Sequence, residues 1–356
     1  MMTDGLDGVV AASTILSDVD GAAGRLVIRG RSLDELAGRT SVEEATALLF
    51  DGFFDDRPSG GEWRAHLGQA RHAVFAEVAA LDERLIRHGP LEAVRALVAR
   101  LADGEDLATA LRLVAAPAVF LPSYLRLRAG HAPVAPDASL GHAADVMRML
   151  RGQPASSVEA AALETYLVTV CDHGLNASTF AARVVASTQA GLTSAVLAGL
   201  GALKGPLHGG APGPVLTMLN DIGEAGDARA WLEAALARGE RLMGFGHRIY
   251  RVRDPRADAL KRALATLGVE AGRLAQAEQV EAAALAVLKD HKPGRRLETN
   301  VEFYTAVLLD ALGFPADSLT CVFAMGRSVG WLAHAREQAT SGRLIRPQSR
   351  YVGPAS

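Results

Sequence analysis

SLTCVFAMGRSVGWLAHAREQ (residues 318–338) is the stretch that decides the fold class of this 356-residue chain. Apolar side chains recur in it every three or four residues, which is the period of an α-helix buried in a core. One arginine, Arg327, stands in the middle of this apolar segment. Because an unpaired buried guanidinium is costly, the sequence predicts an anionic partner for Arg327.

The same helical period continues through most of the chain, in which alanine and leucine dominate. Two predicted helices begin with capping boxes, formed by Ser41 with Glu44 and by Ser156 with Glu159. Only the segment GRLVIRG (24–30) has the pattern of a strand. The fold class is therefore predicted to be mainly α. The clearest predicted helices are 41–50, 156–170, 177–188, 228–238, 280–290 and 318–338, and a further one starts near residue 213.

Composition limits the classes of protein to which the chain can belong. Its length favours two domains, and 49% apolar residues suffice for a sizeable core. A net charge of −3 gives no reason to expect nucleic acid or an anionic membrane as partner. The longest apolar runs, such as 195–203, are too short to span a bilayer, and the first residues lack the basic start of a signal peptide. Cys171 and Cys321 match no metal or redox spacing, so we expect buried reduced thiols in a cytoplasmic protein.

Three of the ten histidines lie in unusual surroundings. His173 lies in CDHGLNAS, His208 in LHGGAPGPV and His247 in MGFGHRIYRVRDPR. Glycines beside the last two allow a ligand or another backbone to come close. A helix starting near residue 213 would point its positive end at His208 and keep the ring neutral, so that it could donate a hydrogen bond to a developing enolate oxygen. A purely structural turn histidine is the alternative. Most of the other histidines are interpreted as surface or satisfied core histidines, as in the case of His66, His72, His88, His142 and His334.

Arginines provide the second signal, because their planar fork suits carboxylates and so favours a polycarboxylate ligand. Arg248 and Arg253 are interpreted as solvated surface. Glu302, at the start of the apolar segment 300–313, is either a helix-terminal acid or a catalytic base. The sequence contains no HExxH, P-loop or GxSxG motif, and no metal site is expected. The other arginines of interest are Arg251 and Arg256 behind His247, and Arg346 near the C-terminus.

Six segments, in this order and spacing, resemble the citrate synthase family. The resemblance implies a mainly α homodimer in which a small domain (210–308) closes over a large helical domain (1–209 and 309–356). It also implies the condensation of acetyl-CoA with oxaloacetate to give citrate and free CoA, without a separate cofactor. The six segments are DHGLNASTFAARV (172–184), GALKGPLHGGA (201–211), GFGHRIYRVRDPRA (244–257), NVEFYTAVLLDALG (300–313), FAMGRSVGWLAH (323–334) and RPQSRYVG (346–353).

The resemblance also implies a role for individual residues. His208 would polarise the acetyl thioester carbonyl, Glu302 would take a methyl proton, and His247 would polarise and protonate the oxaloacetate ketone. The residues expected to bind substrate are His173, Arg256 and Arg327 at the carboxylates of oxaloacetate, Arg346 in the site of the other subunit, and Arg251 and Arg295 facing CoA.

The chain departs from the family pattern next to the expected base. Many members have NVD where this chain has Asn-Val-Glu302, and a Tyr-Pro pair where it has Glu298 and Thr299. After HGGA it has Pro212-Gly213 instead of Asn-Glu. Three functions therefore stay open: a citrate synthase; a close variant, such as a 2-methylcitrate synthase using propionyl-CoA or a lyase-type relative; and a non-catalytic paralogue that binds acyl-CoA or a carboxylate.

Overall fold

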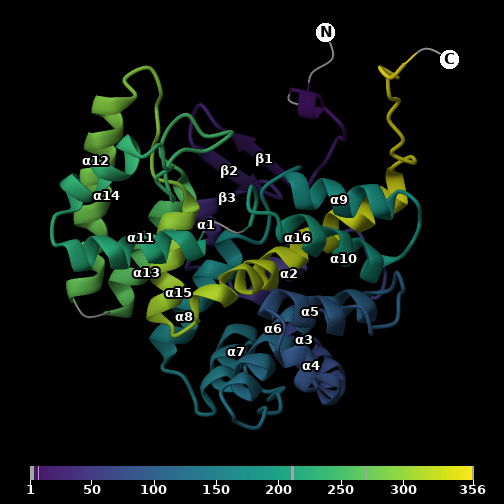
Figure 1. Ribbon diagram of the computed structural model, residues 1–356. Helices are drawn as coiled ribbons and strands as arrows, with labels where there is room; N and C mark the ends of the chain where they lie inside the picture. Colours follow the sequence, from purple (N-terminus) through teal and green to yellow (C-terminus); the bar gives the residue numbers. More distant parts are fainter. Residues whose placement is uncertain (1–3, 7, 210–211, 269–270, 355–356) are drawn as a thin grey trace.

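The computed structural model describes residues 4–6, 8–209, 212–268 and 271–354 (Figure 1). Within these ranges the chain forms sixteen α-helices, three short 3₁₀ helices and one small sheet. The prediction of a mainly α fold is therefore confirmed. The 3₁₀ helices are Asp4–Leu6, Ala76–Ala80 and Ala316–Ser318.

The sheet is a three-stranded antiparallel meander near the N-terminus. Strand β1 (Ser17–Asp20) pairs with β2 (Arg25–Ile28), and β2 pairs with β3 (Arg31–Ser32). Leu26 and Ile28 of β2 point into the core. Strand β2 lies inside the predicted strand 24–30, whereas its two partners are too short and polar to give a strand signal of their own.

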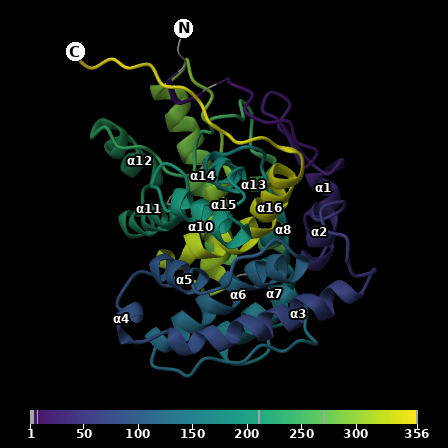
Figure 2. The ribbon, with the colours of Figure 1, turned by 90° about the vertical axis from the view of Figure 1, so that its right-hand side faces the viewer.

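A larger group of helices surrounds α16 (Leu319–Ser341), which contacts α2, α5, α6, α8, α9 and α10 (Figures 1 and 2). The apolar stretch that predicts the fold class is thus the central helix of the molecule. The other members of this group are α1 (Leu33–Leu36), α2 (Val42–Leu49), α3 (Glu62–Phe75), α4 (Glu83–Ile86), α5 (Pro90–Val98), α6 (Leu107–Arg128), α7 (His142–Arg151), α8 (Ser157–Thr169), α9 (Ala177–Ala186) and α10 (Leu192–Leu203).

Five further helices form a smaller group, most of it on the left of Figure 1. Helix α12 packs on α14, and α15 packs on α11 and α13, while α13 also packs on α8 of the larger group. The division into a small domain (210–308) and a large domain (1–209 and 309–356) stays a prediction. The five helices are α11 (Pro212–Ala225), α12 (Ala228–Ala237), α13 (Pro255–Leu267), α14 (Ala271–His291) and α15 (Val301–Ala311).

Both predicted capping boxes are present. Ser41 Oγ and Ser156 Oγ each accept a hydrogen bond of 3.2 Å from the backbone N–H of Glu44 and Glu159 respectively, and each glutamate returns a contact to the serine N–H. These contacts satisfy N–H groups that the first turn of a helix leaves unpaired. Helices α2 and α8 consequently begin where the sequence predicts.

Helix α6 corrects one expectation about apolar segments. With 22 residues it is long and apolar enough, by length and composition, to cross a membrane. However, 83% of its most apolar window is buried inside the fold. The apolar surface of α6 is therefore used in the core, where it packs against α3 and α16.

Two glycines of α16 bring the segment after α8 against the central helix. A Cβ atom on Gly326 would lie 2.6 Å from Cγ2 of Val170, and one on Gly330 would collide with the carbonyl oxygen of Cys171. Only glycine permits this approach of two backbones. As a result, Arg327 on α16 lies beside the short connection that carries His173.

Candidate active site

Six of the residues predicted to act in one site line a single cavity of about 820 Å³. They come from segments that are far apart in the sequence: the connections after α8 and α10, the loop before α13, and helices α13, α15 and α16. Another part of the wall comes from the N-terminal segment, namely from Gly5, Leu6, Gly8, Val9 and Ala11. The six residues are His173, His208, His247, Arg256, Glu302 and Arg327.

His208 is held by the N-terminus of α9. Its Nε2 atom accepts a hydrogen bond of 3.3 Å from the backbone N–H of Ser178 and lies 2.7 Å from the Oγ atom of the same residue. Burial, helped by the charge of Arg327, lowers the pKa of His208 to about 4. The ring is therefore neutral near pH 7, and the backbone donor at Nε2 assigns its proton to Nδ1.

The neutral state of His208 is as predicted, but the helix that contacts the ring differs from the expected one. The sequence pointed to the helix near residue 213, and α11 does begin at Pro212. The hydrogen bonds to the ring nevertheless come from Ser178 in the first turn of α9. Asn176 caps α9 and accepts from Thr179 N at 3.1 Å, which fixes this first turn.

His247 is held in the opposite tautomer. Its Nδ1 atom accepts hydrogen bonds of 3.1 Å from the backbone N–H groups of both Ile249 and Tyr250. Burial, helped by the charge of Arg256, lowers the pKa of His247 to about 4. The single ring proton is thus assigned to Nε2, which lies 3.3 Å from Nη2 of Arg256. Two donors side by side favour an oxygen acceptor between them.

Arg256 is oriented by a buried carboxylate. Asp254 accepts from Nε of Arg256 at 3.0 Å and from Nη2 at 2.7 Å. The same carboxylate accepts from the backbone N–H of Val301 at 3.2 Å. Asp254 thereby joins the start of α13, which carries Arg256, to the start of α15, which carries Glu302.

Arg327 is a buried cation with only part of its hydrogen-bonding capacity used. Its Nε atom donates to the carbonyl oxygen of Val170 at 2.6 Å, whereas Nη2 has no partner among the described residues. Burial lowers the pKa of Arg327 to about 10, so the side chain stays charged near pH 7. A buried donor of this kind is costly unless a ligand supplies the acceptor.

His173 completes the group of donors at this end of the cavity. Its Nε2 atom lies 3.1 Å from the hydroxyl oxygen of Tyr250, and its ring centroid is 5.5 Å from that of His247. Burial, together with the charges of Arg256 and Arg327, holds the pKa of His173 well below its usual range. The cavity therefore combines two guanidinium groups with neutral imidazoles, which suits a small ligand with two carboxylates.

Glu302 lies in the first turn of α15, where Asn300 is the N-cap and accepts from Glu302 N at 3.0 Å. Burial raises the pKa of the Glu302 carboxyl to about 7, and the charge of Asp254 acts in the same direction. The charges of Arg256 and Arg241 oppose this rise. A carboxylate with a pKa near the working pH is suited to accept a proton and return it.

Glu302 and His247 are fixed relative to each other by backbone pairing. The N–H of Asn300 donates to the carbonyl of Gly244 at 2.9 Å, and the N–H of Gly246 donates to the carbonyl of Glu298 at 2.7 Å. The segment before the expected base thus pairs with the segment before the second histidine. Relative movement of the two side chains is correspondingly restricted.

Three predicted site residues do not line this cavity. Arg251 and Arg295 are exposed, and the backbone of Arg251 is held by a hydrogen bond of 2.8 Å from its N–H to the carbonyl of Gly21. Arg346 is exposed on the extended C-terminal segment 342–354, which runs away from the helices (Figures 1 and 2). The roles predicted for these three arginines therefore stay predictions.

Two exposed arginines that the sequence interpretation missed do line the cavity, namely Arg241 and Arg248. Arg241 lies three residues before the glycine-rich segment 244–246. This position close to the glycines beside His247 is the sequence signal by which Arg241 could have been found. Arg253, interpreted as solvated surface, instead pairs with Asp258 at 2.5 Å and with buried Glu281 at 2.6 Å. That interpretation of Arg253 was wrong, because its buried partner Glu281, 28 residues away in the sequence, cannot be predicted from a local pattern.

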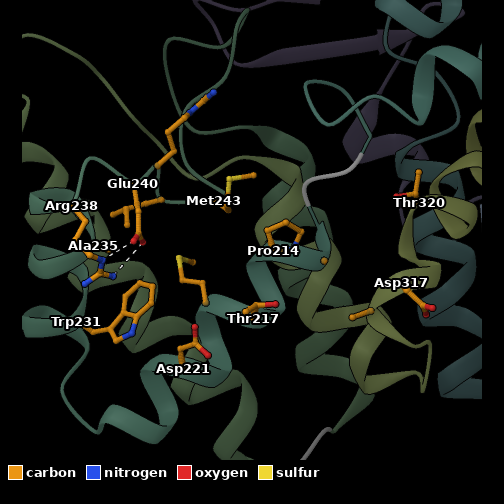
Figure 3. A pocket seen from close by; sticks show the side chains of 15 residues that line it. Pro214, Thr217, Asp221, Trp231, Ala235, Arg238, Glu240, Met243, Asp317 and Thr320 are labelled. Carbon is orange, nitrogen blue, oxygen red and sulfur yellow. Dashed lines mark hydrogen bonds and ion pairs between the residues drawn. The ribbon is translucent and has the colours of Figure 1, made fainter. Parts of the chain in front are cut away.

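A second cavity of about 750 Å³ lies next to the first and shares Arg241, Leu242 and Met243 with it. Figure 3 shows side chains of α11 and α12 on one side, Asp317 and Thr320 on the other, and the ion pair of Arg238 with Glu240 near the rim. None of the predicted catalytic residues lines it. We therefore place the chemistry in the first cavity.

Comparison with known proteins agrees with this geometry. The family model described as the C-terminal domain of citrate synthase matches residues 5–348. The chain belongs to the citrate synthase family. The resemblance inferred from the six sequence segments is confirmed, and the chain is accordingly an acyltransferase of the citrate synthase type.

The relatives and solved structures define how far this family assignment reaches. Putative citrate synthase 2 of Mycobacterium tuberculosis is 41% identical, covering 98% of this chain and 92% of the relative. The 2-methylcitrate synthase of the same organism is 37% identical over 98% of this chain and 90% of its own. The structure of Thermoplasma acidophilum citrate synthase in a ternary complex with carboxymethyl coenzyme A and oxaloacetate superposes with a TM-score of 0.86, at 27% identity over 100% of this chain and 97% of its own. Members with two different products are thus among the relatives.

Proposed function

We propose that this citrate synthase family member condenses acetyl-CoA with oxaloacetate to give citrate and free CoA. The observation that carries the proposal is the pairing of two neutral histidines in opposite tautomers with Glu302 in one cavity. His208 offers Nδ1–H, His247 offers Nε2–H, and Glu302 offers a carboxylate of pKa about 7. The condensation needs two hydrogen-bond donors and one base.

Removal of a methyl proton from acetyl-CoA is the first step. The methyl group of a thioester is a very weak acid, so a carboxylate needs help from a donor at the carbonyl oxygen. Glu302 takes the proton while Nδ1–H of His208 donates a hydrogen bond to the thioester oxygen on which charge develops. A neutral imidazole suits this task because it stabilises the enol without losing its own proton.

Carbon–carbon bond formation and hydrolysis follow. The enol carbon attacks the ketone carbon of oxaloacetate, and Nε2 of His247 gives its proton to the ketone oxygen. Water then attacks the thioester carbonyl of the citryl-CoA so formed, which releases citrate and the CoA thiol. The proton that Glu302 took from the methyl group replaces the one that His247 gave to the ketone oxygen. The two hydrogens of water end on the CoA thiol and on the new carboxyl group, which then ionises, so that acetyl-CoA, oxaloacetate and water give citrate, CoA and one proton.

Substrate recognition is divided between residues that line the cavity and exposed residues outside it. His173, Arg256 and Arg327 bind the carboxylates of oxaloacetate, and the unused donor of Arg327 supports this assignment. Arg251 and Arg295 face CoA. We further propose a cytoplasmic homodimer in which Arg346 reaches the site of the other subunit, and a small domain (210–308) that closes over the substrates and excludes water.

The second candidate is a 2-methylcitrate synthase that uses propionyl-CoA. The relative of that name, which covers 98% of this chain, favours it. The two reactions share every step given above and differ only by one methyl group on the carbon that loses the proton. Discrimination on this scale is worth about 1–3 kcal/mol in an apolar pocket.

Release of free thiol from acetyl-CoA and from propionyl-CoA, each with and without oxaloacetate, tests the proposal. We expect oxaloacetate-dependent release, faster with acetyl-CoA. Faster release from propionyl-CoA would assign the 2-methylcitrate reaction. Binding of both ligands without any thiol release would identify a non-catalytic paralogue and refute the proposal.

A further inference from the structure

A buried carboxylate on α14 collects donors from three neighbouring elements. Glu281, only 6% exposed, accepts hydrogen bonds of 2.6 Å from Oγ1 of Thr299, from the hydroxyl of Tyr304 and from Nη1 of Arg253. The three donors hold its pKa below the usual value against the opposing effect of burial. None of these four residues lines the cavity that holds Glu302.

Thr299 stands three residues before Glu302 and is 1% exposed. Its backbone forms an isolated antiparallel bridge with Phe245, within the pairing that joins this segment to the one before His247. Its hydroxyl points to the other side and donates to Glu281. The carbonyl of Thr299 also accepts a hydrogen bond of 3.3 Å from the backbone N–H of Asp254. The segment that leads to the expected base is therefore anchored by several backbone hydrogen bonds and by this one side chain.

The carboxylate of Glu302 has no such anchor of its own. No hydrogen bond from a described residue reaches its carboxylate oxygens, although its backbone N–H donates to Asn300 at 3.0 Å. A glutamate side chain has one more rotatable bond than an aspartate, so its reach depends more strongly on where the backbone is held. The position of the Glu302 carboxylate must then depend on the hydrogen bonds that hold residues 298–300.

We propose that Glu281 and Thr299 are a positioning pair for the base: their hydrogen bond fixes the backbone from which Glu302 reaches the acyl group. The inference rests on the proposed function, since it assumes that Glu302 removes the proton. It assigns a catalytic consequence to two residues that touch no substrate. A merely structural role would instead affect stability and leave turnover of the folded enzyme unchanged.

Thr299→Val tests the pair, because it keeps the shape of the side chain and removes the hydroxyl. Displacement by about 1 Å costs roughly 100-fold in rate, so for the loss of one anchor among several we expect kcat to fall about 10-fold. The KM for oxaloacetate should change less than about twofold, because Arg256 and Arg327 are held by other contacts. Thr299→Ser, which restores the donor, should bring kcat back to within about twofold of the unmodified chain.

Thr46→Val provides the matched control. Thr46 is fully buried in α2, donates from Oγ1 to the carbonyl of Val42 at 2.7 Å, and lies in the larger helix group. The substitution Thr46→Val should lower the melting temperature of the protein without lowering its kcat. Normal kcat in Thr299→Val, or a loss that Thr299→Ser does not recover, would overturn the inference. Glu302→Gln, measured in parallel, distinguishes a failure of the proposed function from a failure of this inference. Full turnover in Glu302→Gln would refute Glu302 as the base, whatever the turnover of the Thr299 variants.

Discussion

Glu302→Asp shortens the expected base by one methylene group and tests whether this site is built for glutamate. The backbone before it cannot follow the shortened side chain easily. The N–H of Asn300 is bonded to Gly244 at 2.9 Å, and the Thr299 hydroxyl to Glu281 at 2.6 Å. The carboxylate should therefore withdraw from the acyl group by about 1 Å, which costs roughly 100-fold in rate.

A 100-fold loss corresponds to about 2.7 kcal/mol of transition-state stabilisation. We expect it in kcat, measured by thiol release at saturating oxaloacetate, with the KM for oxaloacetate changed less than about twofold, because a base acts mainly in the transition state. A rise in turnover would refute this reasoning, since it would show that the site still fits the aspartate usual in the family. Glu302→Gln is the control that keeps the volume and removes the basicity; if it retained full turnover, Glu302 would not be the base.

Three further predictions test the charges and the assembly of the site. The pKa of Glu302 is raised to about 7, and only its ionised form accepts a proton. The value of kcat/KM for acetyl-CoA should therefore fall as the pH drops through about 7. A flat profile between pH 6 and 8 would contradict the assignment of Glu302 as the base. Arg327→Leu should weaken oxaloacetate binding about 10- to 150-fold in calorimetry, and the fold should persist because a buried, partly unpaired charge is removed; unchanged affinity would make the arginine structural. When the inactive variants Arg346→Ala and His247→Ala are mixed and exchange subunits, each hybrid dimer should regain one working site. If activity does not return although exchange is proven, Arg346 does not act in the partner's site.

Local signals in the sequence were sufficient to predict the mainly α fold class and several of its helices, and together with the family resemblance they indicated six of the residues that line the cavity. The capping boxes of Ser41 and Ser156 located the starts of α2 and α8 to within one residue, because capping involves only contacts within four positions. The six cavity residues were found through glycine-rich surroundings, through charge in an apolar helix, and through the family resemblance. In each case the signal lay within a short segment of sequence.

Contacts between distant segments could not be predicted in the same way. The donor to His208 comes from Ser178, 30 positions earlier, and not from the helix that follows the histidine. Arg253 finds Glu281 across 28 positions, so its burial in a network was missed. Such contacts depend on the packing of whole helices, for example on the glycines that let α16 approach Cys171. No periodicity in the chain encodes them.

The two histidines proposed as catalytic donors are held by the same kind of contact, but in opposite tautomers. In each ring a backbone N–H binds one nitrogen, Nε2 in His208 and Nδ1 in His247, and burial beside an arginine disfavours the charged form. The one remaining proton must then lie on the opposite nitrogen, at Nδ1 of the first and Nε2 of the second. Arg327 and Arg256 thus have two effects, since the positive charges that suit a dicarboxylate also keep the imidazoles neutral. A dianionic ligand would partly cancel these charges and so raise the pKa of both histidines, which makes each ring a weaker acid. The low starting pKa of about 4 leaves room for this rise while both rings stay neutral near pH 7, so the donors keep their tautomers when the ligand is bound.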